Sequence, residues 1–164
     1  MKIIFMDIDD ISNSDRLIAS CTDFDDRVAP PTRVPRRGDT VVLSLFNRAC
    51  EVTGAAVVVS STWLDVVGWA YTRAWLLGSG FDDRHFHERA CIEFGLSGSK
   101  QVGIVDWLKQ HPEVAVDQVC VVDDNPHLFP SGHFLKMRQV VVRGPDGLLL
   151  EHYRAIIQKL GKAR

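Results

Sequence analysis

The chain has 164 residues, with 19 Lys and Arg against 21 Asp and Glu, and a formal net charge of −2. This length suits one domain with a sizeable core, and the charge excludes a strongly basic protein that coats nucleic acid by charge alone. No run of 18 apolar residues and no signal-peptide pattern occurs, so we expect a cytoplasmic protein that does not associate with a membrane. The four cysteines are widely spaced and form no CxxC motif, which indicates reduced thiols and argues against a zinc site.

The predicted elements alternate between strands and helices along the chain. Strand-like apolar runs occur at 2–6, 55–60, 118–123 and 139–142. Helical patterns occur at 41–53, 65–77, about 100–110 and 149–160. Asp39 or Thr40 is the expected N-cap of the helix at 41–53, and Gly54 is expected to end it. This alternation predicts an α/β fold, a three-layer Rossmann-like sandwich with helices on both faces of a central, mostly parallel sheet.

Two segments give weaker patterns. In 79–98, the run from Ala90 to Phe94 is a candidate for a further strand. The segment 12–40 is polar and contains three prolines, and between residues 27 and 37 it carries Arg27, Arg33, Arg36 and Arg37 among acids. Loops of this length are uncommon unless they are functional or disordered, so it is either a solvated surface excursion or a small cap that covers substrate.

Polar residues follow several of the predicted strands. Asp7 and Asp9 end the first run, Asp123 and Asp124 end the third, and Ser60 follows the second with Ser61 after it, while Lys100 opens a helix. Ligands of an open parallel sheet bind outside the carboxyl ends of its strands, so we expect these groups in one site. Carboxylates suit Mg²⁺, and a lysine with a hydroxyl suits phosphate, so the set predicts a magnesium and phosphate site.

Each of these residues also has a simpler interpretation. Ser60, Ser61 and Thr62 could cap the following helix, and the acidic pair could form a turn with Asn125 and Pro126. Lys100 could be a surface lysine at a helix start. We interpret the four tryptophans as packing residues, and the histidines at 85, 87, 127 and 133 as surface residues in loops.

Taken together, the ordered motifs resemble the haloacid dehalogenase (HAD) superfamily of phosphohydrolases. The shared features are a strand ending in DxD, a strand ending in Ser, a Lys, and a strand ending in an acidic pair. The resemblance is closest to small HAD domains associated with RNA-repair proteins, through the Ser60-Ser61-Thr62-Trp63 motif and the stretch 105–112. It extends from Met1 to about Leu160, and it implies a single HAD-like domain over 1–164 with a loop or minimal cap at about 12–40.

The resemblance also implies catalytic roles. Asp7 would be the nucleophile that forms an aspartyl-phosphate, and Asp9 would protonate the leaving oxygen and later activate water. Ser60 would hold a phosphoryl oxygen with Ser61 nearby, and Lys100 would neutralise both the phosphate and the nucleophile. To act as an acid, Asp9 would need its pKa raised from about 3.9 toward roughly 6.

A metal site follows from the same resemblance. Asp123 and Asp124 would hold Mg²⁺ together with the carboxylate of Asp7 and the backbone carbonyl of Asp9. This chain departs from the pattern at Asp10, where relatives often have glycine, and we expect this charge to alter metal or substrate preference. Asp10 also occupies a turn that requires unusual backbone angles, which Asp tolerates better than most residues.

We therefore expect a magnesium-dependent phosphomonoester hydrolase. Its substrate would be a phosphorylated small molecule, such as a nucleotide, or a nucleic-acid end, with no membrane and no obligate protein partner. The alternative is a non-catalytic HAD-like module that binds metal and phosphate without turnover. A phosphoacceptor receiver domain is disfavoured, because its acceptor Asp should end a middle strand, where this chain has Ser60 and Ser61.

Overall fold

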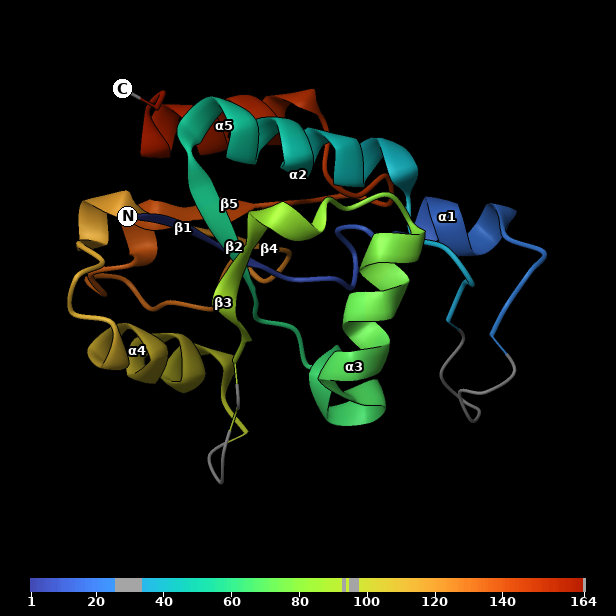
Figure 1. The fold of residues 1–164 in the computed structure, drawn as a ribbon, viewed down its shortest axis with the longest axis horizontal. Coiled ribbons are helices and arrows are strands. Elements are labelled where there is room, and N and C mark those ends of the chain that lie inside the picture. The colour runs from blue at the N-terminus through green and yellow to red at the C-terminus, as the bar shows by residue number, and fades with distance from the viewer. Residues whose placement is uncertain (26–33, 93, 95–97, 164) are drawn as a thin grey trace.

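The structure is a computed structural model and describes residues 1–25, 34–92, 94 and 98–163. Five strands and five α-helices follow one another within these residues (Figure 1). In chain order they are β1 (Lys2–Met6), α1 (Asp15–Ser20), α2 (Thr40–Thr53), β2 (Ala55–Val59), α3 (Trp63–Gly78), β3 (Phe86–Cys91), α4 (Lys100–Gln110), β4 (Val119–Asp123), β5 (Gln139–Val141) and α5 (Leu150–Leu160).

All strand pairs of the described sheet are parallel, in the order β3-β2-β1-β4-β5. The chain starts at the central strand β1, builds outward to β3, and then crosses back to β4 on the other side. The strand order therefore reverses between β1 and β4, and such a switch point opens a crevice at the carboxyl ends of the strands. Met6 is paired with Val122 there, which places Asp7 beside Asp123.

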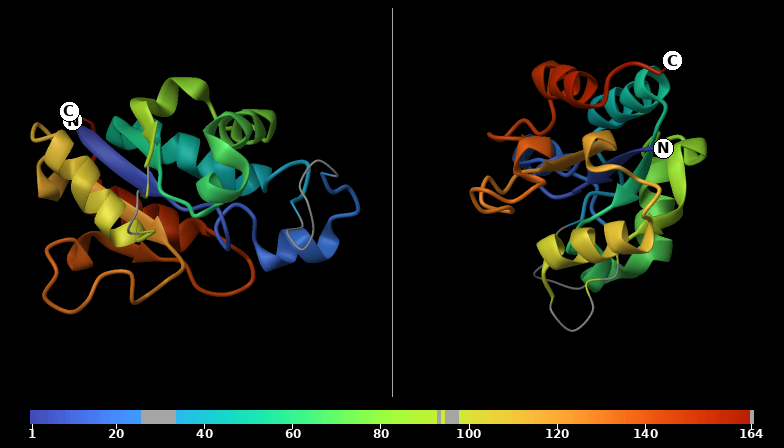
Figure 2. Two further views of the ribbon diagram at one scale, coloured as in Figure 1. Left: turned by 90° about the horizontal axis from the view of Figure 1, so that it is seen from below. Right: turned by 90° about the vertical axis from the view of Figure 1, so that its left-hand side faces the viewer.

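The sheet is covered on both faces, as the α/β prediction requires. Figures 1 and 2 show α2 and α5 side by side over one face and α4 over the other. Side chains of β1 alternate between two cores: Ile4 and Met6 face the cluster that includes α2 and α5, while Ile3 and Phe5 face the cluster that includes α4. This alternation follows from the two-residue period of a strand, and it makes β1 a fully buried frame for the residues after it.

Most predicted boundaries agree with the observed ones to within two residues. Asp39 is the N-cap of α2, and Gly54 ends this helix with a positive φ of 71°. The helix α3 is interrupted at Gly68, whose φ of 75° is not helical. The predicted strand at 90–94 was misplaced, because β3 spans Phe86–Cys91 at the sheet edge. Because β3 is an edge strand, where polar side chains are tolerated, the first half of β3 lacks an apolar pattern.

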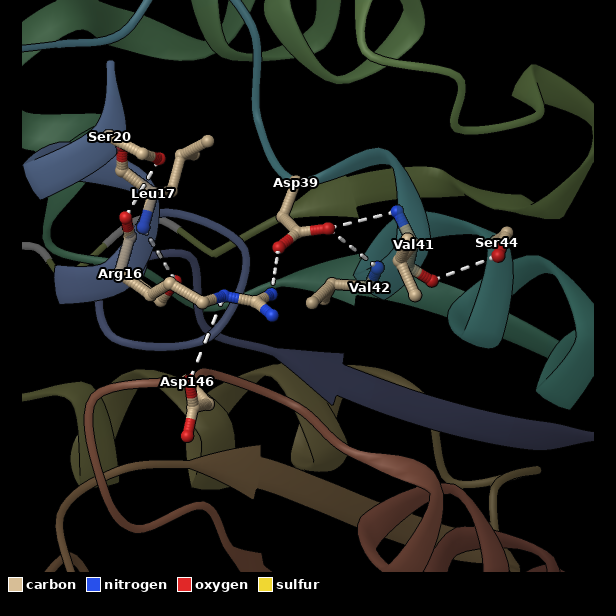
Figure 3. Close-up of polar contacts among 9 residues, drawn as sticks. Arg16, Leu17, Ser20, Asp39, Val41, Val42, Ser44 and Asp146 are labelled. Carbon is tan, nitrogen blue, oxygen red and sulfur yellow. Dashed lines mark hydrogen bonds and ion pairs between the residues drawn. The ribbon is translucent and has the colours of Figure 1, made fainter.

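The described part of the segment 12–40 contains the helix α1, which the sequence pattern did not predict. Figure 3 shows the Arg16 side chain of α1 extended between Asp39 and Asp146. Arg16 Nη2 lies 2.5 Å from Asp39 Oδ2, and Arg16 Nε lies 3.8 Å from Asp146 Oδ1. The stretch 26–33, which includes Arg27 and Arg33, lies outside the described residues. The described part of this segment is thus held to α2 and to the turn before α5.

The interpretation of the tryptophans as packing residues is confirmed, since Trp63, Trp75 and Trp107 are buried and Trp69 is partly buried. The interpretation of His87 as a surface residue was wrong. Its ring is 7% exposed and packs against Trp107, with ring centroids 5.1 Å apart. The described residues contain no helix long and apolar enough to span a membrane.

Candidate active site

The centre of the site is a lysine held between two buried carboxylates. The Lys100 ammonium donates to Asp7 Oδ2 at 2.5 Å and to Asp123 Oδ2 at 2.8 Å. Asp7 immediately follows β1 and Asp123 ends β4, whereas Lys100 begins α4. The Lys100 side chain is only 13% exposed, so it is not a surface lysine. The prediction that Asp7, Lys100 and Asp123 come together is confirmed.

The remaining carboxylate oxygens are held by backbone groups. Asp7 Oδ1 accepts the N–H of Ile8 at 2.8 Å, and Asp123 Oδ1 accepts the N–H of Asn125 at 2.9 Å. The turn interpretation of the acidic pair is therefore correct as well, because one oxygen of Asp123 closes the turn with Asn125 while the other contacts Lys100. Each carboxylate is fixed at both oxygens, which lowers the reorganisation needed when a ligand binds.

The pKa values of Lys100 and Asp123 are both raised, but for different reasons. Burial alone would lower the pKa of Lys100, but the charges and hydrogen bonds of Asp7 and Asp123 outweigh it, so the pKa lies above its ordinary value. Burial, reinforced by the charge of Asp7, raises the pKa of Asp123 to about 6, although Lys100 opposes this. Lys100 is therefore cationic near neutral pH.

Asp124 completes a set of oxygen donors. Ligand oxygens of Asp7, Asp123 and Asp124 lie within 4.8 Å of one another. Carboxylate oxygens are the donors that Mg²⁺ prefers, and a Mg²⁺ site commonly has few protein ligands. The residues therefore fit this ion, and the charge of Lys100 reduces the repulsion among the three carboxylates. Asp9 is not part of this side-chain set among the described residues.

Asp9 lies in the loop that follows β1 and lines the same cleft as Asp7. Its carboxylate accepts a hydrogen bond from the Asn13 side-chain amide at 3.2 Å. Burial raises the pKa of Asp9, the hydrogen bond from Asn13 lowers it part of the way, and the charges of Asp7 and Asp10 raise it further. The net direction is upward, as a general acid requires.

The serines after β2 differ from one another. Ser60 is fully buried, and its hydroxyl oxygen has no hydrogen-bond partner within the described part of the chain. Ser61 is also buried, and its hydroxyl accepts the N–H of Trp63, the first residue of α3, at 3.2 Å. Thr62 is the N-cap of α3 but makes no side-chain cap hydrogen bond, so the capping interpretation holds only in that Ser61 bonds the first N–H of the helix. Ser60 keeps an unsatisfied hydroxyl at the carboxyl end of β2.

The carboxylates and Lys100 open to the surface through a cleft of about 640 Å³. It is lined by Asp7, Asp9, Asp10, Thr62, Ser99, Lys100, Gln101, Asp123, Asp124, Asn125, Pro126, His127 and Leu128. Ser60 and Ser61 do not line it, and Thr62 at the start of α3 takes the place expected of them. The cleft thus collects residues from the ends of β1 and β4 and the starts of α3 and α4.

Comparison with known proteins agrees with this geometry. The family described as the HAD domain in Swiss Army Knife RNA repair proteins matches residues 3–153. The chain belongs to this HAD family. No curated protein and no solved structure matches the chain. The family supports a phosphohydrolase-type role in general terms, and it confirms the resemblance to RNA-repair-associated HAD domains.

This HAD domain has an unusual residue in its first motif. Asp10 has a φ of 55° and is the only non-glycine residue with positive φ in the ranges that the structure describes. The expectation that Asp10 occupies a turn with unusual backbone angles is confirmed. Burial raises the pKa of Asp10, and the charges of Asp124, Asp15 and Asp7 add to this effect. The HAD domain therefore carries additional negative charge beside the candidate metal ligands.

The site of this HAD domain includes residues that the sequence did not predict, and three of them are polar side chains with a contact or position of note. Asn13 contacts Asp9, Thr62 lines the cleft, and Ser99 lines it while its hydroxyl caps α4 by accepting the N–H of Val102. The DxD motif gave no signal for Asn13, six positions after Asp7. Thr62 had a usable signal, because it follows Ser60 and Ser61 at the start of a helix, where anions bind.

Proposed function

We propose that this HAD domain is a magnesium-dependent phosphomonoester hydrolase that acts through an aspartyl-phosphate intermediate. The observation that carries the proposal is the Lys100 ammonium between Asp7 and Asp123 in the cleft. A purely structural ion pair would not need two carboxylates from neighbouring strands around one lysine at the switch point of the sheet. The family match supports the reaction class.

In the proposed first step, a carboxylate oxygen of Asp7 attacks the phosphorus atom of the ester. The bond from phosphorus to the leaving oxygen breaks, and that oxygen takes the proton of the Asp9 carboxyl group. In the second step, Asp9 removes a proton from water, and the water oxygen displaces the Asp7 carboxylate from phosphorus. The products are the alcohol and inorganic phosphate, and Asp9 is protonated again.

The approach of an anionic nucleophile to an anionic ester requires neutralisation of charge. Lys100 supplies a positive charge beside the nucleophile, and the hydroxyl of Thr62, which lines the cleft, offers a donor to a phosphoryl oxygen. Ser60 would supply a further hydroxyl if a phosphoryl oxygen reached it. Mg²⁺ held by Asp7, Asp123 and Asp124 would add Lewis-acid polarisation of the phosphoryl group.

The proposed substrate is a nucleotide or a phosphorylated nucleic-acid end. Its support is the association of the family with RNA repair and the open cleft. Arg36 and Arg37 are exposed in the segment before α2 and could contact backbone phosphates, although Arg36 also pairs with Asp23 at 2.6 Å. Replacing Arg37 with Ala should raise KM for a phosphorylated oligonucleotide more than KM for a small aryl ester, and equal effects would remove this argument.

Phosphate release by the purified protein tests the proposal. The substrates are an aryl phosphate, mononucleotides, and oligonucleotides phosphorylated at either end, each with Mg²⁺ or with EDTA. We expect turnover that requires Mg²⁺ and is lost in Asp7→Asn. Asp106→Asn, on the exposed face of α4, is the matched control and should retain activity. If no substrate is turned over although Mg²⁺ binds, the chain is better explained as a non-catalytic module that binds metal and phosphate.

A further inference from the structure

Asn13 is a buried polar residue between β1 and α1 that none of the roles above explains. It is 6% exposed, and its side-chain amide nitrogen donates to Asp9 Oδ1 at 3.2 Å. Its own amide oxygen is buried and has no hydrogen-bond partner among the described residues. The polar contact that Asn13 makes through its side chain is therefore directed at the proposed general acid.

The backbone of this loop fixes Asn13 relative to Asp9. The carbonyl oxygen of Ile8 accepts the N–H groups of Ile11, Ser12 and Asn13, at 3.2, 2.9 and 3.0 Å. The N–H of Asp10 donates back to the carbonyl oxygen of Asn13 at 3.2 Å. Four hydrogen bonds thus close the turn that carries the acid, so the Asn13 side chain has little freedom to move away from Asp9.

The surroundings hold the turn from outside as well. The next residue, Ser14, caps α1 by accepting the N–H of Leu17 at 3.3 Å. Gly147 approaches the carbonyl oxygen of Ile11 so closely that a Cβ at this glycine would lie 2.2 Å from that oxygen. The loop is therefore packed against the turn before α5, and the position of Asn13 is determined by the fold.

The unpartnered oxygen of Asn13 indicates that the amide does not serve stability. A buried carbonyl oxygen without a partner is unfavourable, and an apolar side chain of the same shape avoids this cost. Leu has nearly the shape of Asn and no polar atoms. The fold gains nothing from this amide except the contact with Asp9, so the benefit of Asn13 must be sought in what Asp9 does.

We infer that Asn13 is a positioning residue for Asp9, which orients the carboxyl group for proton transfer to the leaving oxygen. Because the Asn13 amide donates to Oδ1, the transferable proton is placed on Oδ2. During the first step this proton moves from Oδ2 to the leaving oxygen as the bond to phosphorus breaks. The inference rests on the proposed function, since it requires Asp9 to act as the acid of that reaction.

The test is the dependence of kcat/KM on the leaving group in Asn13→Leu. Aryl phosphates with phenols of graded pKa are suitable, because 4-nitrophenol leaves readily without a proton whereas phenol needs one. We expect Asn13→Leu to lose roughly 10- to 100-fold on phenyl phosphate, within the usual contribution of a general acid, and less than about threefold on 4-nitrophenyl phosphate. The ratio kcat/KM is the correct quantity, because it reports the steps up to the first displacement.

Two further variants separate positioning from simple damage to the fold. Asn47 is a structural asparagine whose side chain donates to the carbonyl oxygen of Gly80 and accepts the N–H of Asp82, at 2.8 and 3.0 Å. Asn47→Leu should destabilise the protein without changing the ratio between the two esters. In an Asp9→Asn background, Asn13→Leu should have no additional effect on phenyl phosphate, because the group that it positions is already absent.

The outcomes are distinct. A steeper leaving-group dependence in Asn13→Leu, absent from Asn47→Leu, supports the inference. An equal loss on all esters, or an undiminished effect in the Asp9→Asn background, overturns it while the proposed function stands. If the wild-type protein turns over none of the aryl phosphates, mononucleotides or phosphorylated oligonucleotides, the proposed function fails, and the inference that rests on it fails with it.

Discussion

Arg16 and Asp39 are joined by an ion pair across 23 residues of sequence, between the start of α1 and the N-cap of α2 (Figure 3). The two oxygens of Asp39 have different tasks. Oδ1 accepts the N–H groups of Val41 and Val42, at 2.9 and 3.3 Å, while Oδ2 accepts from the Arg16 guanidinium. One carboxylate therefore both starts α2 and anchors α1, which follows the loop that carries Asp9 and Asn13.

Asp39→Ala should lower the free energy of unfolding by about 1–2 kcal/mol, because it removes the cap and leaves the first N–H groups of α2 without a partner. Arg16→Gln should cost less, at most about 1 kcal/mol, since the Arg16 side chain is 49% exposed and such pairs are weak. Urea denaturation of both variants measures the two losses in the free energy of unfolding, and we expect the loss to be larger in Asp39→Ala. Equal costs would show that the ion pair, and not the cap, dominates at Asp39.

Asp10→Gly should stabilise the protein by about 1 kcal/mol, because glycine adopts a positive φ without steric cost. It also removes a carboxylate that lies near Asp124, Asp15 and Asp7. Thermal and urea denaturation measure the change. Asp106→Gly, within α4, is the matched control and should destabilise by a few tenths of a kcal/mol, roughly 0.3, because glycine is less favourable than Asp inside a helix. A loss of stability in Asp10→Gly would mean that the Asp10 side chain makes a favourable contact.

Addition of Mg²⁺ should raise the melting temperature of the wild-type protein, because a ligand that binds only the folded state stabilises it, by about 2.7 kcal/mol at 100 times Kd. Asp123→Asn should abolish the rise and Asp124→Asn should weaken it, since both remove ligand charge. Calorimetry or thermal denaturation with EDTA as the reference measures the effect, and Asp106→Asn is the control. An undiminished rise in Asp123→Asn would place the ion elsewhere.

Protonation of His152 should destabilise the protein. Burial lowers the pKa of His152 below its ordinary value, although Glu151 opposes this, and its Nδ1 accepts the N–H of Leu149 at 3.0 Å at the start of α5. Above about pH 6.5 the ring is neutral in both the folded and the unfolded state. As the pH falls below 6.5, the unfolded state binds the proton first, so the free energy of unfolding decreases until the folded-state pKa has been passed.

Comparison with His152→Gln isolates this effect, because the Gln side chain can still accept the N–H of Leu149 but does not titrate. Groups with raised pKa values, such as Asp123, act in the opposite direction at lower pH, and they cancel in the difference between the two proteins. Urea denaturation at pH 7.5 and 5.5 should show the wild type losing stability relative to the variant. A difference that does not depend on pH would mean that His152 does not titrate in this range.

The sequence by itself determined four of the five described strands, most helices and the order of the motifs. Apolar runs such as 3–6 and 119–122 predict buried parallel strands, and the carboxyl ends of parallel strands lie at one edge. That Asp7 and Asp123 lie at the same edge of the sheet follows from these two facts, and the pairing of β1 with β4 makes them neighbours. Such features are readable because periodicity, capping and chain order are local properties, and because a parallel sheet converts strand ends into a shared site.

The tertiary structure alone decided which side chains contact one another within that site. Lys100 pairs with Asp7 across 93 residues of sequence, and the amide of Asn13 donates to Asp9. The hydroxyl of Ser60 has no partner among the described residues, whereas that of Ser61 accepts the N–H of Trp63 at the start of α3. The tertiary structure also placed β3 at the sheet edge, where the polar pattern had concealed its first half. These details depend on packing between distant segments, and a hydrogen bond forms or fails within a few tenths of an ångström, which no local pattern encodes.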